Sequence, residues 1–240
     1  MEGKDFIPSR RDTRRLVEGL LLLEAVLVLL YLVERALGSP FWFFQRLLDL
    51  NGELSVAAWF SSMQLFAVGL VLLLKAWRPG GLAPVGRWLL YVAGFAFVFL
   101  SADEALAIHE SITNGLARFE WSPHFKNGHG RWIPVYLAAV VAFAIVSLPR
   151  LLFVWRNFRA PFLLCLGGFV VFVAGAVGAE VIGYDMIGAA SPLALTVEVA
   201  CEEWMEMAGI TLVLAGALGL LREDREPVFA SVAERLRALP

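Results

Sequence analysis

The residues of this chain with the clearest capacity for chemistry are acids placed within long apolar segments. Nine of them fall in three such segments or directly beyond their ends: Asp103, Glu104, Glu110, Glu180, Asp185, Glu198, Glu202, Glu203 and Glu206. Apart from Arg87 at one boundary, these segments hold no Lys or Arg. An acidic side chain near the centre of a membrane helix costs about 2.5–3.5 kcal/mol on insertion scales, so the set requires a source of positive charge. A bound cation, protons retained on the carboxyl groups, or loop cations such as Arg118, Lys126 and Arg131 could supply it.

Helical spacing indicates which of these acids share a face. With about 3.6 residues per turn, Asp103 and Glu110 point the same way, and His109 lies beside them. Glu202 and Glu206 are one helical turn apart and form a carboxylate stripe. If the three segments end at the same side of a membrane, these side chains meet. The metal ligands that the sequence predicts are Asp103, His109, Glu110, Glu202 and Glu206.

Carboxylates combined with imidazole are ligands that zinc, manganese and iron accept. Carboxylates alone favour calcium or magnesium. We therefore predict a divalent metal ion as cofactor, namely zinc, manganese or iron. Glu180 or Glu203 is the predicted general base toward a water at the metal, or a further ligand.

A purely structural interpretation competes with this metal site. Acids near a membrane boundary, such as Glu104, Asp185 and Glu198, can stay solvated among lipid headgroups, and protonated Glu pairs can join helices by hydrogen bonds. His124 and His129 lie in a glycine-rich polar loop, which favours exposure over metal binding.

The elements that must position these acids are long apolar helices. Hydrophobic residues make up 59% of the 240 residues, charged residues make up 18%, and the mean hydropathy is +0.72. That is too apolar for a soluble domain of this length. Segments that reach the roughly 20 residues needed to cross a bilayer occupy about 16–37, 55–76, 87–110, 134–156, 160–182 and 192–221. The sequence predicts an all-α, polytopic membrane protein with six transmembrane helices.

The flanking segments complete the predicted organisation. Residues 1–15 form a basic tail, 16–221 the transmembrane domain and 222–240 an amphipathic tail. The first apolar segment is too long for a signal peptide and carries Glu18 and Glu24, so we expect a retained helix. Only five of the 20 basic residues lie on the side opposite the termini: Arg35, Arg46, Arg118, Lys126 and Arg131. This asymmetry predicts cytoplasmic termini, an acidic site on the outer side, and a bacterial-type inner (plasma) membrane as the location.

Two contacts between helices are also predicted. Glycines gather in 160–182 and 192–221, which indicates that these two helices touch. Glu24 in the first helix can meet Gln64 in the second, either as a hydrogen-bonded pair or as a station on a proton or ion path.

These patterns lead to one main hypothesis about function and two alternatives. The net charge of -2 shows no basic face for nucleic acid. We expect a metal-dependent membrane enzyme, a hydrolase or an oxidase, acting on a lipid or another membrane-soluble small molecule. The alternatives are a proton- or cation-coupled transporter that uses the same acids, and a structural subunit of a membrane complex in which the acids stabilise an interface.

Overall fold

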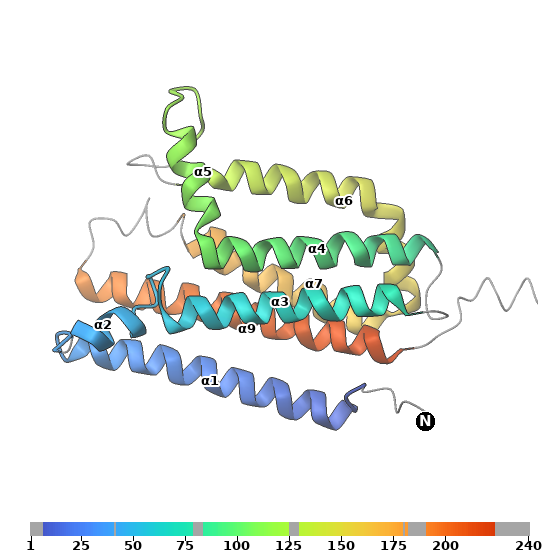
Figure 1. Cartoon of the computed structure of the whole chain (residues 1–240), viewed down its shortest axis with the longest axis horizontal. Helices are drawn as coiled ribbons and strands as arrows, with labels where there is room; N and C mark the ends of the chain where they lie inside the picture. The colour runs from blue at the N-terminus through green and yellow to red at the C-terminus, as the bar shows by residue number, and fades with distance from the viewer. Residues whose placement is uncertain are drawn as a thin grey trace, which may run out of the picture.

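The computed structural model describes residues 7–40, 42–78, 84–124, 130–179, 181 and 191–223, and this part of the chain contains helices and no strand. Six helices are long and apolar enough to cross a membrane, and they lie side by side as a bundle (Figure 1). Their membrane spans are Arg10–Ala36, Val56–Trp77, Gly86–Leu106, Trp132–Asn157, Arg159–Gly178 and Pro192–Arg222. The predicted all-α fold with six transmembrane helices is confirmed.

The helices have the following bounds: α1 Arg10–Ala36, α2 Trp42–Leu48, α3 Val56–Trp77, α4 Pro84–Leu106, α5 Ile108–Leu116, α6 Trp132–Asn157, α7 Arg159–Val173 and α9 Pro192–Arg222. The chain leaves α7 as a short π-helical segment, η2, over Ala174–Ala179. Helix α2 lies in the first connection, and its Trp42 is exposed.

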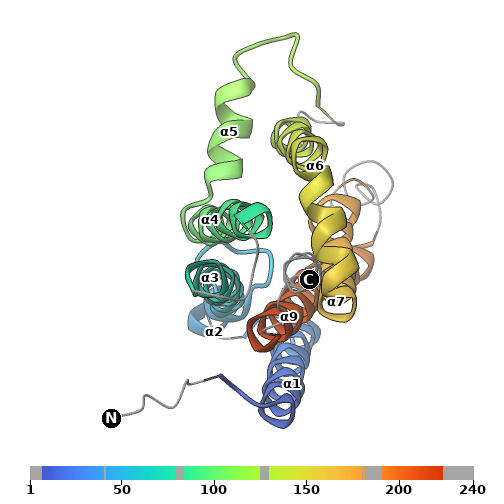
Figure 2. The same ribbon diagram turned by 90° about the vertical axis from the view of Figure 1, so that its right-hand side faces the viewer.

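Helix α9 is the centre of the bundle. It packs against α1, α3 and α7, and these three helices surround it when the bundle is viewed end-on (Figure 2). The core formed there includes Val68 of α3 and Ile210 and Ala217 of α9, none of which is exposed to solvent. Helix α6 stands at the rim and leaves most of its apolar side chains exposed. The second half of α9 is therefore an interior helix, whereas α6 faces the lipid.

Helix α1 begins earlier than the predicted boundary at residue 16. The Ser9 side chain accepts a hydrogen bond from the Asp12 backbone N–H, and the Asp12 carboxylate accepts one from the Ser9 backbone N–H. This reciprocal capping box fixes the first turn at Arg10. The predicted basic tail 1–15 is therefore partly helical, because a polar capping signal and not hydropathy determines where α1 starts.

Both described ends of the chain lie at one end of the bundle. The Arg222 guanidinium, at the end of α9, donates a hydrogen bond of 3.3 Å to the Ser9 carbonyl, just before α1. An even number of crossings requires this arrangement. Which side of a membrane this end faces stays a prediction, and the predicted amphipathic tail lies, from residue 224 onward, outside the described residues.

Helices α7 and α9 touch along a line of glycines, as the sequence predicts. A Cβ atom on Gly168 would stand 2.6 Å from the Gly209 carbonyl oxygen and 2.6 Å from the Val213 nitrogen. A Cβ on Gly209 would stand 2.5 Å from the Phe172 nitrogen. Small residues thus let the two backbones come into direct contact.

We predict that Gly168→Ala lowers the stability of the protein, whereas Gly167→Ala does not. The added methyl group at 168 forces the backbones apart, which costs about 1–3 kcal/mol, while a Cβ on Gly167 has nothing within 4 Å. Alanine also has the higher helix propensity at both positions. Thermal unfolding of both variants in detergent checks this, and equal melting temperatures would contradict the close contact.

Candidate functional site

The helix that carries Asp103 does not continue to residue 110, so the predicted boundary 87–110 is wrong at its end. Helix α4 ends at Leu106, and Ala107 adopts a left-handed conformation with φ 50°. A non-glycine residue in this conformation costs about 1–2 kcal/mol. Asp103 Oδ1 offsets that cost by accepting a 2.7 Å hydrogen bond from the His109 backbone N–H at the start of α5. The break gives α5 a new direction, so Asp103 and Glu110 do not share one helical face.

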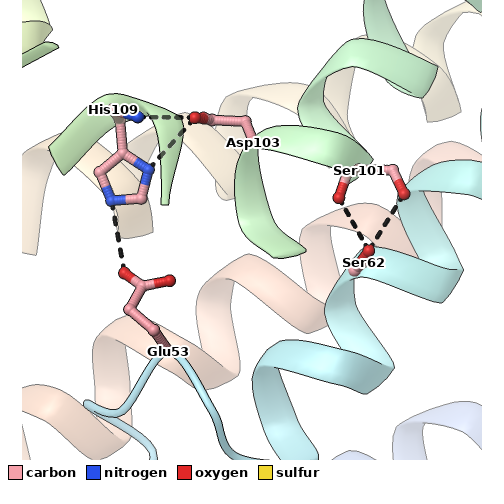
Figure 3. A network of polar contacts seen from close by, with 5 residues as sticks. All are labelled: Glu53, Ser62, Ser101, Asp103 and His109. Carbon is pink, nitrogen blue, oxygen red and sulfur yellow. Dashed lines mark hydrogen bonds and ion pairs between the residues drawn. The ribbon is translucent and has the colours of Figure 1, made fainter. Parts of the chain in front are cut away.

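The same carboxylate also holds the His109 ring. His109 Nδ1 lies 3.4 Å from Asp103 Oδ1, and His109 Nε2 lies 3.7 Å from Glu53 Oε1 (Figure 3). Asp103 is buried with 7% exposure, while the side chains of His109 and Glu53 are partly exposed. The imidazole therefore stands between two carboxylates, with Nε2 on the more open side.

Two further acids approach this group from α4 and α9. Glu104 lies within electrostatic range of Glu53 and His109, and Glu203 lies within range of Glu104 and Glu53. We call Glu53, Asp103, Glu104, His109 and Glu203 the His109 cluster. Among the described residues, His109 is its only ion-pairing partner of opposite charge. The cluster thus joins a loop, the α4–α5 turn and α9, with an excess of negative charge.

The excess of negative charge shifts the pKa values of His109 and Glu53, the two members of the cluster that lie outside the membrane spans. Burial lowers the pKa of His109, but the hydrogen bond and charge of Asp103, with the charges of Glu53 and Glu104, outweigh it and raise the pKa above its usual value. Burial also raises the pKa of Glu53, and the nearby Glu110 and Asp103 raise it further, against a lowering by His109. Both shifts show a local shortage of positive charge.

Aromatic and hydroxyl side chains hold the cluster in place. The Trp132 ring packs edge-on against His109 at 5.5 Å between centroids, and the buried Tyr136 hydroxyl lies beside Asp103. Next to the cluster, Ser62 of α3 donates a 2.8 Å hydrogen bond to the Ser101 carbonyl oxygen of α4 (Figure 3). These contacts fix the end of α4 against its neighbours.

The structure brings together some of the sequence-predicted site residues and separates others. Asp103, His109 and Glu203 are in the cluster, and the exposed Glu110 lies within electrostatic range of Glu53. Glu202 and Glu206 lie against Gly175 of η2, since a Cβ there would stand 2.9 Å from the Glu202 carbonyl oxygen and 3.0 Å from Glu206 Cγ.

Other predicted residues can be placed only in part. Glu180, Asp185 and His129 lie outside the described residues, whereas His124 is exposed, as the sequence predicts. The loop cation Arg131 is buried, and its guanidinium donates to the Ser122 carbonyl oxygen at 3.0 Å. In the described part of the chain, Arg131 is therefore engaged within its own loop and does not cover the acids.

Sequence reasoning missed Glu53. This residue precedes α3 in the first connection, outside every apolar segment, so the pattern of acids within apolar segments does not include it. Topology offered a signal, because the first connection lies at the same end of the bundle as the α4–α5 turn. A loop acid next to the Ser55 helix cap was thus within reach of the site.

The nitrogen and oxygen atoms of the His109 cluster are of the types that bind a divalent metal ion, but only some of the distances between them allow shared coordination. Two atoms that bind one zinc ion at about 2.0–2.2 Å stand at most about 4 Å apart, so the 3.7 Å between His109 Nε2 and Glu53 Oε1 is compatible with shared coordination. Within the described ranges, no three His, Cys, Asp or Glu side chains converge closely enough to hold a metal ion. A third protein ligand therefore requires a rotation of Glu104 or Glu203.

Comparison with known proteins places the chain in a family without giving it an activity. No curated protein and no solved structure matches it. One family, described as domain of unknown function DUF8692, matches residues 20–219. That range covers most of the bundle, including the whole His109 cluster, and the chain therefore belongs to the DUF8692 family.

Proposed function

We propose that this protein is a membrane-embedded, metal-dependent enzyme whose site is the His109 cluster. The observation that carries the proposal is the orientation of His109, whose Nδ1 faces Asp103 while Nε2 faces Glu53. A carboxylate on one ring nitrogen is the usual way in which a metal-binding histidine is oriented and made more basic. Nε2 is then the nitrogen available to a metal.

Each residue of the cluster has a distinct task in this proposal. His109 and Glu53 hold a zinc, manganese or iron ion, and Asp103 orients His109. Glu104 provides a third ligand, and Glu203 accepts a proton from the reacting water or substrate. The metal, when bound, supplies Lewis acidity at the reacting group. Glu180 remains a second candidate for the general base on the evidence of the sequence.

The surroundings of the site favour a lipid or another membrane-soluble substrate. Leu106, at the end of α4, is 69% exposed, and Trp121, after α5, is 77% exposed. Exposed apolar and aromatic side chains at the end of membrane helices are typical of the interface between hydrocarbon and headgroups. A substrate that enters from the bilayer meets the cluster at this level.

The distribution of basic residues supports a location of the site on the outer side of a bacterial-type inner membrane. The proposed reaction is a hydrolysis or an oxidation.

Elemental analysis of the purified protein tests the proposal. We expect about one or two divalent ions per chain in the wild type, and a metal-free protein would refute it. Glu104→Gln should lower the metal content, because Glu104 is the third ligand in this proposal and lies within electrostatic range of Glu53 and His109. Glu206→Gln is the comparison, since Glu206 Cγ lies against Gly175, and the glutamine should leave the content close to that of the wild type. Loss of metal only in Glu206→Gln would move the site to the α9–η2 contact.

One observation favours the transporter as a second candidate. Glu24 is a fully buried acid in the middle of α1, far from the cluster's end of the bundle. Ionisable groups at two depths are what a proton or ion path needs. Reconstituted vesicles distinguish the candidates, because a transporter moves protons or metal ions across the bilayer and an enzyme retains its metal.

A further inference from the structure

A second polar site lies within the apolar core, formed by Glu24 of α1, Gln64 of α3 and Thr211 of α9. Gln64 Nε2 donates to Glu24 Oε1 at 2.8 Å, and the Thr211 hydroxyl donates to the same oxygen at 2.6 Å. Gln64 Nε2 also lies 2.7 Å from the Thr211 hydroxyl oxygen. The predicted contact of Glu24 with Gln64 is thus confirmed, and Thr211 completes a triad.

The triad lies close to the middle of the membrane. At a rise of about 1.5 Å per residue, Glu24 is roughly 21 Å from the start of α1, and Gln64 and Thr211 are roughly 17–20 Å from the ends of α3 and α9 at the same side. The hydrocarbon core is about 30 Å thick, so all three depths fall near its centre. Glu24, Gln64 and Thr211 are 0%, 4% and 0% exposed.

Two oxygen atoms of the triad have no hydrogen-bond partner within the described chain: Glu24 Oε2 and Gln64 Oε1. Both are buried acceptors, and a buried acceptor without a donor costs about 1–3 kcal/mol. The two atoms belong to the two groups that are already joined through Glu24 Oε1 and Gln64 Nε2. What the pair lacks is one donor hydrogen.

We propose that the triad is a proton-binding site, in which Glu24 carries a proton on Oε2 and donates it to Gln64 Oε1. One proton removes the charge from the centre of the membrane and gives both orphaned oxygens a partner. The carboxyl and amide groups then form a reciprocal pair of hydrogen bonds, while Thr211 continues to donate to Glu24 Oε1. The site binds its proton independently of the His109 cluster, so it holds whether or not that cluster binds a metal.

Two substitutions of Glu24 test the proposal, because a glutamine side chain has nearly the shape of a neutral glutamic acid and an alanine side chain does not. Glu24→Gln replaces the proposed O–H with an N–H of nearly the same shape and keeps an oxygen for Gln64 and Thr211. Glu24→Ala removes the acceptor and leaves a cavity. We expect the glutamine variant to melt at the temperature of the wild type and the alanine variant to melt more than about 4 °C lower. A glutamine variant that melts as low as the alanine variant, or fails to fold, would overturn the proposal.

Infrared spectroscopy of the whole protein in detergent gives a direct readout. The wild type should show a carbonyl band from a protonated carboxyl group that Glu24→Gln lacks. Glu18→Gln, which removes an exposed acid of the same helix, should leave that band unchanged. Loss of a carboxylate band instead of a carbonyl band, or a band that shifts with sodium concentration, would show an ionised Glu24 and refute the proton site.

Discussion

The His109→Ala variant is expected to bind its divalent metal more than about 100-fold more weakly than the wild type. Loss of a residue that only orients a ligand already costs about 10–100-fold in metal affinity, and His109 supplies the one nitrogen of the cluster. Titration of the metal-free protein with zinc or manganese against a chromophoric chelator measures the affinity.

His124→Ala is the matched control, because His124 is exposed and lies on the same side of the bundle. Its affinity should equal that of the wild type. Removal of His109 also removes the packing against Trp132, so Glu53→Gln provides a second variant that keeps the shape of the site. If both His109→Ala and Glu53→Gln fold and bind metal as the wild type does, the His109 cluster is not the metal site.

The Asp103→Asn variant is expected to bind the metal about 10–100-fold more weakly at high pH and to shift the pH dependence of binding. Asparagine keeps Oδ1 as the acceptor for the His109 backbone N–H, so the α4–α5 turn is preserved. It removes the charge that raises the pKa of His109. The metal needs a neutral imidazole, so binding is lost as the pH falls through that pKa. Because the pKa falls in the variant, half-maximal binding should move to lower pH.

This displacement of the pH profile separates orientation from general damage to the fold. A variant that is merely destabilised loses affinity with an unchanged pH midpoint, and that result would show that Asp103 does not act through His109. Asp49→Asn is the control, because Asp49 pairs with Arg35 at 2.7 Å and lies outside the His109 cluster. Its binding midpoint should not move.

Most of the fold could be predicted from the sequence because hydropathy alone determines which segments cross a bilayer. All six spans were predicted in this way. The contact between α7 and α9 was predicted from their glycines, because small residues let two helix backbones come close. Hydropathy says little about polar signals. The start of α1 at Arg10 depends on the Ser9 capping box, and the end of α4 at Leu106 depends on the left-handed Ala107.

The candidate site was predicted less completely, for the same reason. Helical spacing assumes a continuous helix, so it predicted a face shared by Asp103 and Glu110, which the break at Ala107 removes. The predicted neighbourhood of Asp103 and His109 is kept, through the turn and not through a continuous helix. Spacing along α9 predicts a stripe of Glu202 and Glu206, but helical periodicity does not say which neighbouring helix such a stripe faces. Glu203, one position along, is the residue of that helix that reaches Glu53 and Glu104.

The central position of α9 has a consequence for how this protein is made. Of the six spans it is the last to be synthesised, and it is the helix against which α1, α3 and α7 pack. Until α9 inserts, Glu24 and Gln64 lack Thr211, and the cluster lacks Glu203. Both polar sites are therefore complete only after the last of the six spans has joined the bundle.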